Sequence, residues 1–286
     1  MRYHPSELQA FLLGLGLSPK KFLSQNFLID GNIIRKILHL GGVKEGDHVL
    51  EIGPGPGALT EALLQEKAYV TAVEMDGAFA AALEQLQTDG NHLEVISQDF
   101  LKFDIEAFCK NIKKKIKVVA NLPYHITTPI LAKLLPLTSH IESLTVMVQK
   151  EVAKRFLAEP GSKDWNSFSL FLRFYADPAY GFTVEPTCFF PKPQVQSAVV
   201  KLTLKKPPEV SCPVRFFKLT RTAFGQRRKM LRASLKKIYP SKLIEESIQE
   251  FGAKSDVRPE ELSLPDFLRL FEIIDQKTRD IKSQET

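Results

Sequence analysis

The feature that most restricts the fold is a regular alternation of short apolar runs with helical periods over residues 47–150. The apolar runs predict strands at 49–52, 69–73, 93–96, 118–120 and 144–148. The helical periods between them predict helices at 58–65, 78–86 and 130–135. Alternation of this kind is typical of a parallel sheet with crossover helices. The chain is therefore predicted to contain an α/β domain.

Sequence on both sides of this stretch extends the predicted domain. The segments 183–185 and 197–204 have the composition of late strands in the same sheet. Near the start, Leu8, Leu12 and Leu15 have the spacing of one face of an amphipathic helix. We therefore expect a first domain at 1–204, with an N-terminal helical extension at 1–18.

A proline-rich segment at 205–213 lacks hydrophobic periodicity and predicts a linker. Beyond it every pattern is helical, and the predicted helices lie at 216–224, 229–238, 242–251 and 265–274. The last residues, 276–286, are polar and are expected to fray. Residues 214–286 thus predict a small, all-helical C-terminal domain.

Composition adds limited information about partners and compartment. Thirty-nine Lys and Arg residues against 33 Asp and Glu residues give a net charge of +6, which suits a polyanionic partner. Cys109, Cys188 and Cys212 are isolated from one another and from histidines, so they indicate neither a zinc site nor a disulfide framework. The apolar run at 11–13 is too short for a signal or membrane segment. A cytoplasmic protein that needs no metal and contacts no membrane is expected.

A glycine-rich turn at 53–57 lies between the first strand and its helix, where open α/β sheets bind nucleotides or nucleosides. Pro54 and Pro56 have no N–H groups, and no Lys-Ser or Lys-Thr pair follows, so the turn is poorly suited to a pyrophosphate. A ligand without phosphates, such as S-adenosylmethionine approaching Gly53 and Gly55, fits better. The alternative is that the glycines only permit tight strand-to-helix packing.

Two carboxylates follow the next two strands. Glu74 ends the second strand, about twenty residues after the turn, where an acid can accept hydrogen bonds from ribose hydroxyls. Asp76 is better explained as the cap of the following helix. Asp99 follows the third strand and can accept from an adenine amino group, although a helix-capping role is an equal alternative.

The fourth strand ends in Asn121-Leu122-Pro123-Tyr124. The Asn121 side-chain oxygen and the Leu122 carbonyl can accept the two N–H bonds of an adenine amino group, and Pro123 fixes the turn without adding a donor. Tyr124 is placed to stack on the base. Two acceptors on one amino group direct its lone pair at an electrophile, so this chemistry requires no general base. The alternative is a plain exit from strand to turn.

Together these segments resemble the class I S-adenosylmethionine-dependent methyltransferases. The combination with Asn121–Ile130 is similar to the ribosomal RNA adenine dimethyltransferase family, KsgA (also called RsmA). Three further segments of the chain match this family: Ser24–Leu28, Phe189–Ser197 and Ala223–Lys229. The resemblance covers roughly residues 20 to 275 and implies a Rossmann-like class I methyltransferase sheet followed by a small helical domain.

The resemblance also implies roles for individual residues. In the cofactor site it implies contacts from Asn26, Leu28, Gly53, Gly55, Glu74, Asp99 and Asn121. In the catalytic site it implies that Asn121 and Leu122 grip the amino group, with Tyr124 and Phe189 on the two faces of a flipped adenine. Basic and polar residues of the helical domain become candidate contacts to RNA phosphates: Arg221, Gln226, Arg227, Arg228 and Lys229.

The activity that the resemblance implies is dimethylation of N6 on two adjacent adenosines in the 3′-terminal hairpin of small-subunit ribosomal RNA, in an assembling 30S particle. S-adenosylmethionine is the expected methyl donor, S-adenosylhomocysteine the product, and a monomer the expected state. Two alternatives stay open. One is a ribosome-assembly or nucleic-acid-binding factor that keeps the fold without chemistry. The other is an Erm-type methyltransferase of large-subunit ribosomal RNA.

Overall fold

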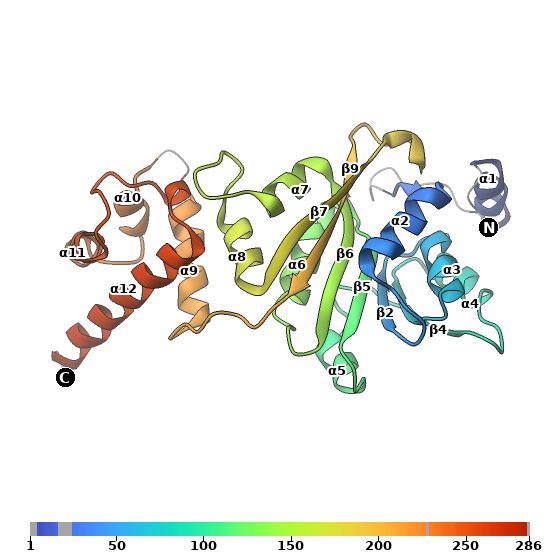
Figure 1. The fold of residues 1–286 in the computed structure, drawn as a ribbon, viewed down its shortest axis with the longest axis horizontal. Coiled ribbons are helices and arrows are strands. Elements are labelled where there is room, and N and C mark those ends of the chain that lie inside the picture. Colours follow the sequence, from blue (N-terminus) through green and yellow to red (C-terminus); the bar gives the residue numbers. More distant parts are fainter. Residues whose placement is uncertain (1–4, 17–24, 227–228, 285–286) are drawn as a thin grey trace. The chain divides into compact units, whose positions relative to one another are not determined.

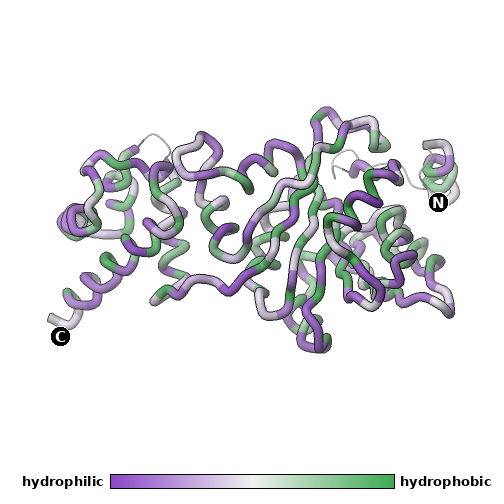
Figure 2. The backbone as a smooth tube through the Cα atoms, viewed as in Figure 1, coloured by the Kyte–Doolittle hydropathy of each residue, from purple (hydrophilic) through white to green (hydrophobic). Residues whose placement is uncertain are grey.

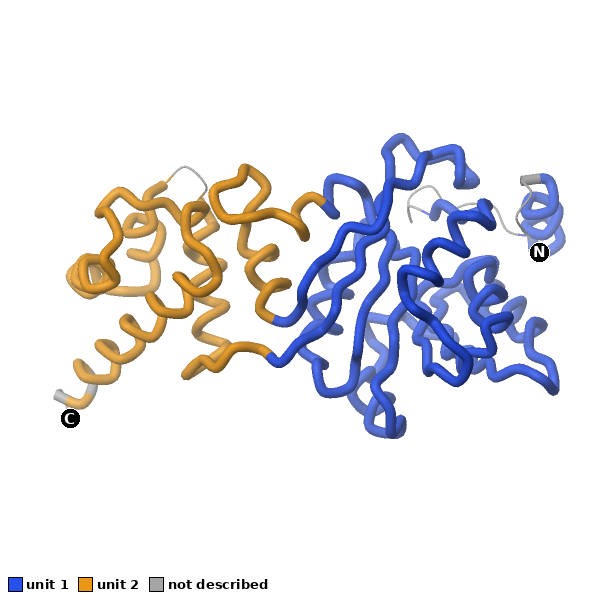
Figure 3. Tube along the Cα trace, in the orientation of Figure 1, with its two compact units in different colours: residues 1–153, 175–206 blue, residues 154–174, 207–286 orange. Residues whose placement is uncertain are grey.

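The computed structural model describes residues 5–16, 25–226 and 229–284. Contacts between Cα atoms divide the chain into two compact units (Figure 3). The first unit comprises residues 1–153 and 175–206, and the second comprises residues 154–174 and 207–286. Among the described residues, no helix is both long and apolar enough to cross a membrane.

The first unit is built on a seven-stranded sheet with the order β4-β3-β2-β5-β6-β9-β7 (Figure 1). Its strands, in chain order, are β2 (His48–Ile52), β3 (Tyr69–Glu74), β4 (His92–Ser97), β5 (Ile116–Asn121), β6 (Ile141–Gln149), β7 (Ala176–Val184) and β9 (Ser197–Leu204). The pairs from β4 to β6 are parallel, whereas β9 runs antiparallel to both β6 and β7. The predicted Rossmann-like α/β fold is confirmed.

The edge strand β7 is longer than its sequence pattern indicates, because only 183–185 has strand-like composition. Its first half contains Pro178, and proline is tolerated on edge strands because one side of such a strand has no ladder for an N–H to join. The register against β9 shifts between Tyr180 and Phe182, around Gly181. A Cβ at Gly181 would lie 2.9 Å from the Val199 carbonyl oxygen, so glycine is required where the two strands approach.

A large hydrophobic core fixes the sheet against its helices. It joins side chains of α2 (Gly31–Gly41) and α3 (Ala58–Gln65) to strands of the sheet. Ile34 and Leu63 are almost fully buried there, as are Val119 and Val199 from the strands. Figure 2 shows hydrophobic stretches along the strands and hydrophilic ones along many loops. Asp30 caps α2 by accepting hydrogen bonds from Asn32 and Ile33.

The order of the strands creates a switch point between β2 and β5. From β2 the chain adds β3 and β4 on one side, and then returns to add β5 and β6 on the other. Helices α3, α4 (Gly77–Glu84), α5 (Ile105–Lys110) and α6 (Thr127–Leu134) lie in these four connections. In open α/β sheets, ligands bind at such a point, outside the carboxyl ends of the strands. The predicted site residues follow these ends.

A second, two-stranded sheet joins distant parts of the first unit. Strand β1 (Phe27–Leu28) pairs antiparallel with β8 (Phe189–Phe190). The N-terminal helix α1 (Pro5–Gly14) lies in the predicted extension, and its Leu8 and Leu12 pack in one apolar cluster with Phe27 and Phe79. The pairing of β1 with β8 therefore brings together two segments that the sequence analysis identified separately, Ser24–Leu28 and Phe189–Ser197.

The second unit contains the four C-terminal helices that the sequence predicts. They are α9 (Pro213–Phe224), α10 (Leu231–Leu235), α11 (Ser241–Phe251) and α12 (Leu264–Gln284). It also contains residues 154–174, with the end of α7 (Lys150–Leu157) and most of α8 (Ser167–Tyr175), which the predicted division placed in the first domain. Trp165 explains the grouping, because its ring N–H donates to the Leu262 carbonyl at 3.0 Å. Phe171 and Phe174 also contact Phe217 at ring distances of 4.9 and 5.0 Å.

The prediction that residues 276–286 fray is wrong for the described part of this segment. Helix α12 continues to Gln284. Two ion pairs hold its last turns: Arg279 with Asp275 at 2.8 Å, and Lys277 with Glu250 of α11 at 2.9 Å. Asp275 is 2% exposed and also pairs with Arg215 at 2.6 Å. Polar composition indicates exposure, but it does not reveal such partners.

Candidate functional site

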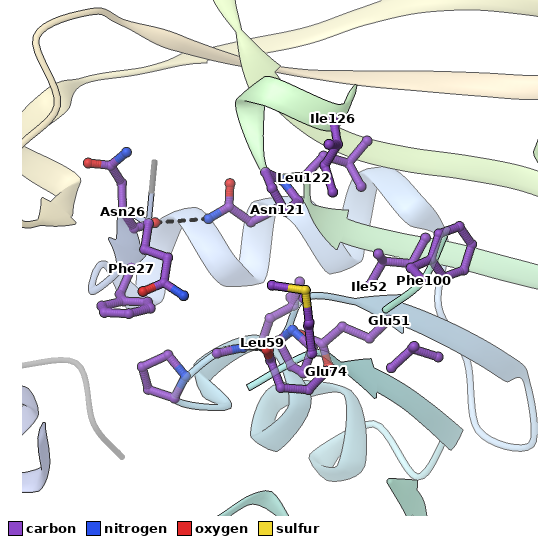
Figure 4. Close-up of a pocket in the computed structure, with 18 of the residues that line it drawn as sticks. Asn26, Phe27, Glu51, Ile52, Leu59, Glu74, Phe100, Asn121, Leu122 and Ile126 are labelled. Carbon is purple, nitrogen blue, oxygen red and sulfur yellow. Dashed lines mark hydrogen bonds between the residues drawn. The ribbon is translucent and has the colours of Figure 1, made fainter. Parts of the chain in front are cut away.

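A cavity of about 260 Å³ opens at the carboxyl ends of β2, β3, β4 and β5 (Figure 4). The segments that follow these four strands all contribute to its walls, and the N-terminal segment 25–28 adds a further side. The cavity therefore lies at the switch point of the sheet. It contains most of the residues predicted for the cofactor and for the target base.

The glycine turn has the backbone that its sequence requires. Gly53 and Gly55 adopt positive φ angles of 64° and 56°, a region that glycine enters without strain. A Cβ at Gly55 would also lie 3.1 Å from the Phe27 ring. The N–H groups of Gly53, Gly55 and Gly57 donate to Val73 O, Glu74 Oε2 and Pro54 O. All three glycine N–H groups of this turn therefore donate to protein oxygens, so none of them is left to bind a phosphate.

Glu74 is fixed at the end of β3 and is 6% exposed. Its two carboxylate oxygens accept from the backbone N–H groups of Gly55 and Asp76, each at 2.9 Å. Burial raises the pKa of Glu74, and the two backbone hydrogen bonds act against that rise. Asp76 caps α4 through Ala78 and Phe79, as expected. The glycine turn and Glu74 therefore hold each other in place.

Asp99 lies on the loop between β4 and α5, and it lines the cavity beside Phe100 and Leu101. Its Oδ1 accepts from the Leu101 N–H at 2.9 Å, so the carboxylate organises its own loop. The alternative that Asp99 caps a helix is wrong, because Asp99 bonds within a turn and Asp104 is the residue that caps α5 (Ile105–Lys110). A carboxylate has lone pairs for further donors, so the local bond leaves a ligand role possible.

Asn121 ends β5 and is tied to the N-terminal segment. Its Nδ2 donates to the Asn26 carbonyl at 3.1 Å (Figure 4). This bond fixes the orientation of the amide, so that Oδ1 is the side-chain atom left to accept from a ligand. Asn26, Leu28 and Asn121 all line the same cavity.

The rest of the turn after Asn121 is fixed by hydrogen bonds to other parts of the first unit. The Leu122 N–H donates to Met147 O at 3.1 Å, and the Pro123 carbonyl accepts from Thr127 Oγ1 at 3.1 Å. Tyr124 begins a short 3-10 helix, η2 (Tyr124–Ile126), and its hydroxyl bonds Ser197 Oγ at 2.7 Å. Burial raises the pKa of Tyr124. The tyrosine is therefore a neutral, anchored ring at the cavity wall.

Phe189 does not line this cavity, and the predicted phosphate contacts belong to the other unit. Phe189 is 3% exposed in the main core and is not among the described residues that line the cavity. Its stacking role stays a prediction. Arg221, Gln226 and Lys229 belong to the second unit, where Arg221 and Lys229 are exposed. Arg227 and Arg228 lie outside the described residues.

The structure adds two residues that the sequence patterns did not reveal as part of the site. Leu8 of α1 lines the cavity, although it is more than forty residues from the glycine turn in sequence. Glu51 also lines it, is 2% exposed, and has one oxygen, Oε2, without a hydrogen-bond partner. Alternation within a strand shows which side chains share a face, and it could have indicated that Glu51 is buried. In the part of the chain that the structure describes, no cluster of His, Cys, Asp and Glu has a metal-binding arrangement.

Glu51 is expected to make stability depend on pH in the protein without ligand. Burial, aided by the charge of Glu74, raises its pKa from 4.5 to about 8. The folded state therefore keeps a proton that the unfolded state releases above about pH 4.5, and stability falls as pH rises from there to about 8. The upper limit of the loss is about 5 kcal/mol.

Urea unfolding of the wild type and Glu51→Gln at pH 5, 6.5 and 8 measures this effect. The variant carries no titrating group at this position, so its stability should fall less between pH 5 and pH 8. Parallel pH curves for the two proteins would contradict the assignment.

Leu8 is expected to affect ligand binding through the apolar cluster around Phe27. Leu8→Asp places a charge where the side chain is 1% exposed, so α1 should detach from the cavity wall. We expect the affinity for S-adenosylhomocysteine to fall about tenfold, the effect of about 1.4 kcal/mol of lost contact. Leu13→Asp is the matched control, because Leu13 on the same helix is 72% exposed. Equal calorimetric dissociation constants for the two variants would show that α1 does not contribute.

The chain matches the family model described as ribosomal RNA adenine dimethylase over residues 16–276. It is similar to the ribosomal RNA small subunit methyltransferase A of Protochlamydia amoebophila, with 53% identity over 272 residues, covering 94% of this chain and 96% of that protein. The protein of the same name from Chlamydia caviae is 50% identical over 277 residues, covering 96% of this chain and 98% of that protein.

Solved structures agree in fold. A dimethyladenosine transferase from Plasmodium falciparum aligns with a TM-score of 0.74 and 26% identity, over 88% of this chain and 98% of that one. The 23S rRNA methyltransferase ErmE aligns with a TM-score of 0.66 and 26% identity, over 87% of this chain and all of that one (100%). The family model matches nearly the whole chain, and the cavity lies at the switch point of the sheet. The chain therefore belongs to the ribosomal RNA adenine dimethylase family and has the class I methyltransferase fold.

Proposed function

We propose that the protein transfers methyl groups from S-adenosylmethionine to N6 of two adjacent adenosines in the 3′-terminal hairpin of small-subunit ribosomal RNA, giving N6,N6-dimethyladenosine. One observation carries the proposal: the glycine turn, Glu74, Asp99 and the segment Asn121–Tyr124 border a single cavity. The protein is proposed to act in the cytoplasm as a monomer, on an assembling small subunit, and without a metal.

The residues present fit S-adenosylmethionine. The turn at Gly53 and Gly55 allows a close backbone approach and leaves no glycine N–H for a phosphate, and the Glu74 carboxylate is held in place for the ribose hydroxyls. Asp99 is assigned to the adenine, and Asn26 and Leu28 to the open side of the ligand. When bound, S-adenosylmethionine supplies an electrophilic methyl group on its sulfonium.

The protein's part in the chemistry is to orient a poor nucleophile. The lone pair of the adenine amino group is delocalised into the ring, so the amino group must be held by both N–H bonds. Asn121 Oδ1 accepts one, with its amide fixed by the bond to Asn26, and the Leu122 carbonyl accepts the other. The nitrogen is then pyramidalised toward the methyl group, and it loses its proton to water after transfer.

The target base must leave its helix to reach the cavity. A stacked adenine keeps its amino group away from a methyl donor in a protein pocket, so the base is flipped out, and stacking on Tyr124 offsets part of the lost stacking. Phe189 is proposed for the opposite face of the base. Basic and polar side chains of the second unit are proposed to contact the RNA backbone: Arg221, Gln226, Arg227, Arg228 and Lys229.

The choice of the small subunit is supported by the two chlamydial relatives, which are named small subunit methyltransferases. The similarity to ErmE supports the other candidate, a large-subunit substrate, at lower identity. Incubation with labelled S-adenosylmethionine separates the two. Label should enter unmethylated small-subunit particles, and large-subunit particles should remain unlabelled. Label in the large subunit alone would overturn the proposed substrate, and no label in either would overturn the activity.

A further inference from the structure

Lys133 of α6 donates hydrogen bonds from its ammonium group to three backbone carbonyls in the loop between β4 and α5. Its Nζ lies 3.2 Å from Phe100 O, 2.8 Å from Leu101 O and 2.5 Å from Phe103 O. The same atom lies 5.6 Å from the centre of the Phe100 ring. An ammonium group has three N–H donors, so this set uses its full hydrogen-bonding capacity.

The loop that Lys133 holds is the wall of the cavity after β4. Phe100 and Leu101 line the cavity together with Asp99. The peptide group between Phe100 and Leu101 is bound on both sides: its carbonyl, Phe100 O, accepts from Lys133 at 3.2 Å, and its N–H, that of Leu101, donates to Asp99 Oδ1 at 2.9 Å. The position of the Asp99 carboxylate therefore depends on a peptide that Lys133 fixes.

The other end of α6 belongs to the opposite wall. The helix starts at Thr127, directly after η2, and Thr127 bonds the Pro123 carbonyl of the turn that follows Asn121. Lys133 lies near the end of α6, beside the loop after β4. The short helix α6 therefore connects two parts of the cavity wall. At its start is the turn proposed to bind the target base, and near its end is the loop proposed to bind the adenine of the methyl donor.

We propose that Lys133 is a positioning residue that sets the Asp99 loop for the adenine of S-adenosylmethionine and ties it to the turn that binds the target. This inference rests on the proposed function, because the ligand is S-adenosylmethionine. Lysine suits the task better than arginine, since three carbonyls converge on one point and a planar guanidinium spreads its donors. Lys133 acts through Asp99 and does not touch the reacting atoms.

The test compares two ligands on each variant by calorimetric titration. S-adenosylhomocysteine carries the adenine amino group, and S-inosylhomocysteine carries an oxygen in its place. The wild type should prefer the first strongly. In Lys133→Met the dissociation constant for S-adenosylhomocysteine should rise about tenfold, a typical effect of losing hydrogen bonds from a charged donor, while that for S-inosylhomocysteine should change much less. Methyl transfer at saturating S-adenosylmethionine should stay within about threefold of the wild type, because Asn121 and Leu122 remain in place.

The matched control is Lys102→Met, which removes an exposed lysine from the same loop and should leave both dissociation constants unchanged. If Lys133→Met does not fold, Lys133→Arg serves instead, with a rise of about threefold for S-adenosylhomocysteine alone. Equal weakening for both ligands, or no weakening, overturns the role of Lys133. A wild type that binds neither ligand overturns the proposed function instead.

Discussion

Replacement of Asn121 by alanine is expected to lower the rate of methyl transfer by ~10²–10³-fold at saturating S-adenosylmethionine, the usual effect of removing one preorganised polar group that acts in the transition state. The variant loses the acceptor for one N–H of the target adenine and the bond that ties β5 to Asn26. The measurement is single-turnover incorporation of labelled methyl into unmethylated small subunits.

Two companion variants sharpen this prediction. Asn111→Ala removes an exposed asparagine from the end of α5 and should leave the rate unchanged. Asn121→Asp keeps an acceptor but loses the N–H that bonds Asn26, so its rate should lie between those of the wild type and the alanine variant. A fully active, folded Asn121→Ala protein would contradict the proposed grip on the amino group.

Replacement of Glu74 by alanine is expected to weaken the binding of S-adenosylmethionine by ~100-fold or more. The change removes the proposed ribose acceptor and leaves the N–H groups of Gly55 and Asp76 without their partner, and each buried, unpaired group has a free-energy cost of about 1–3 kcal/mol. The glycine turn should lose its shape as well. Isothermal titration with S-adenosylmethionine measures the effect.

Glu94→Ala is the control for the loss of a carboxylate, because Glu94 lies on the neighbouring strand β4 and is exposed. It should bind like the wild type. Glu74→Gln should be intermediate, since an amide keeps one acceptor oxygen and replaces the other by a donor. Unchanged affinity in Glu74→Ala would show that the cavity holds another kind of ligand.

The sequence predicted the parallel part of the sheet well because each strand there is a short apolar run with clear boundaries. The place of Glu74 beside the glycine turn could also be predicted, since an acid at the end of the second strand of an α/β sheet lies near the turn that follows the first. The place of Tyr124 at the cavity could be predicted from the Asn-Leu-Pro-Tyr sequence that follows β5, two strands later. These residues depend on local patterns and on the order of strands, and both are visible in a sequence.

Other parts depend on contacts that no local pattern encodes. The pairing of Phe27 with Phe190 joins segments more than 160 residues apart, and Leu8 reaches the cavity only because α1 packs on Phe27 and Phe79. Asp275, just before the polar end of α12, pairs with Arg215 and Arg279, and polar composition does not reveal these partners. Lys133 has no distinguishing sequence context, because its three partners are backbone carbonyls.

The most direct test of the proposed methyl transfer is nucleoside mapping of the product. Unmethylated small subunits are incubated with S-adenosylmethionine and either the wild type or Asn121→Ala, and the 3′-terminal fragment of the small-subunit RNA is examined by mass spectrometry. We predict N6,N6-dimethyladenosine at two neighbouring positions with the wild type and, at the same short incubation time, roughly a hundredfold less or lower with the variant. Methylation at another atom or in another RNA, or equal products from both proteins, would contradict it.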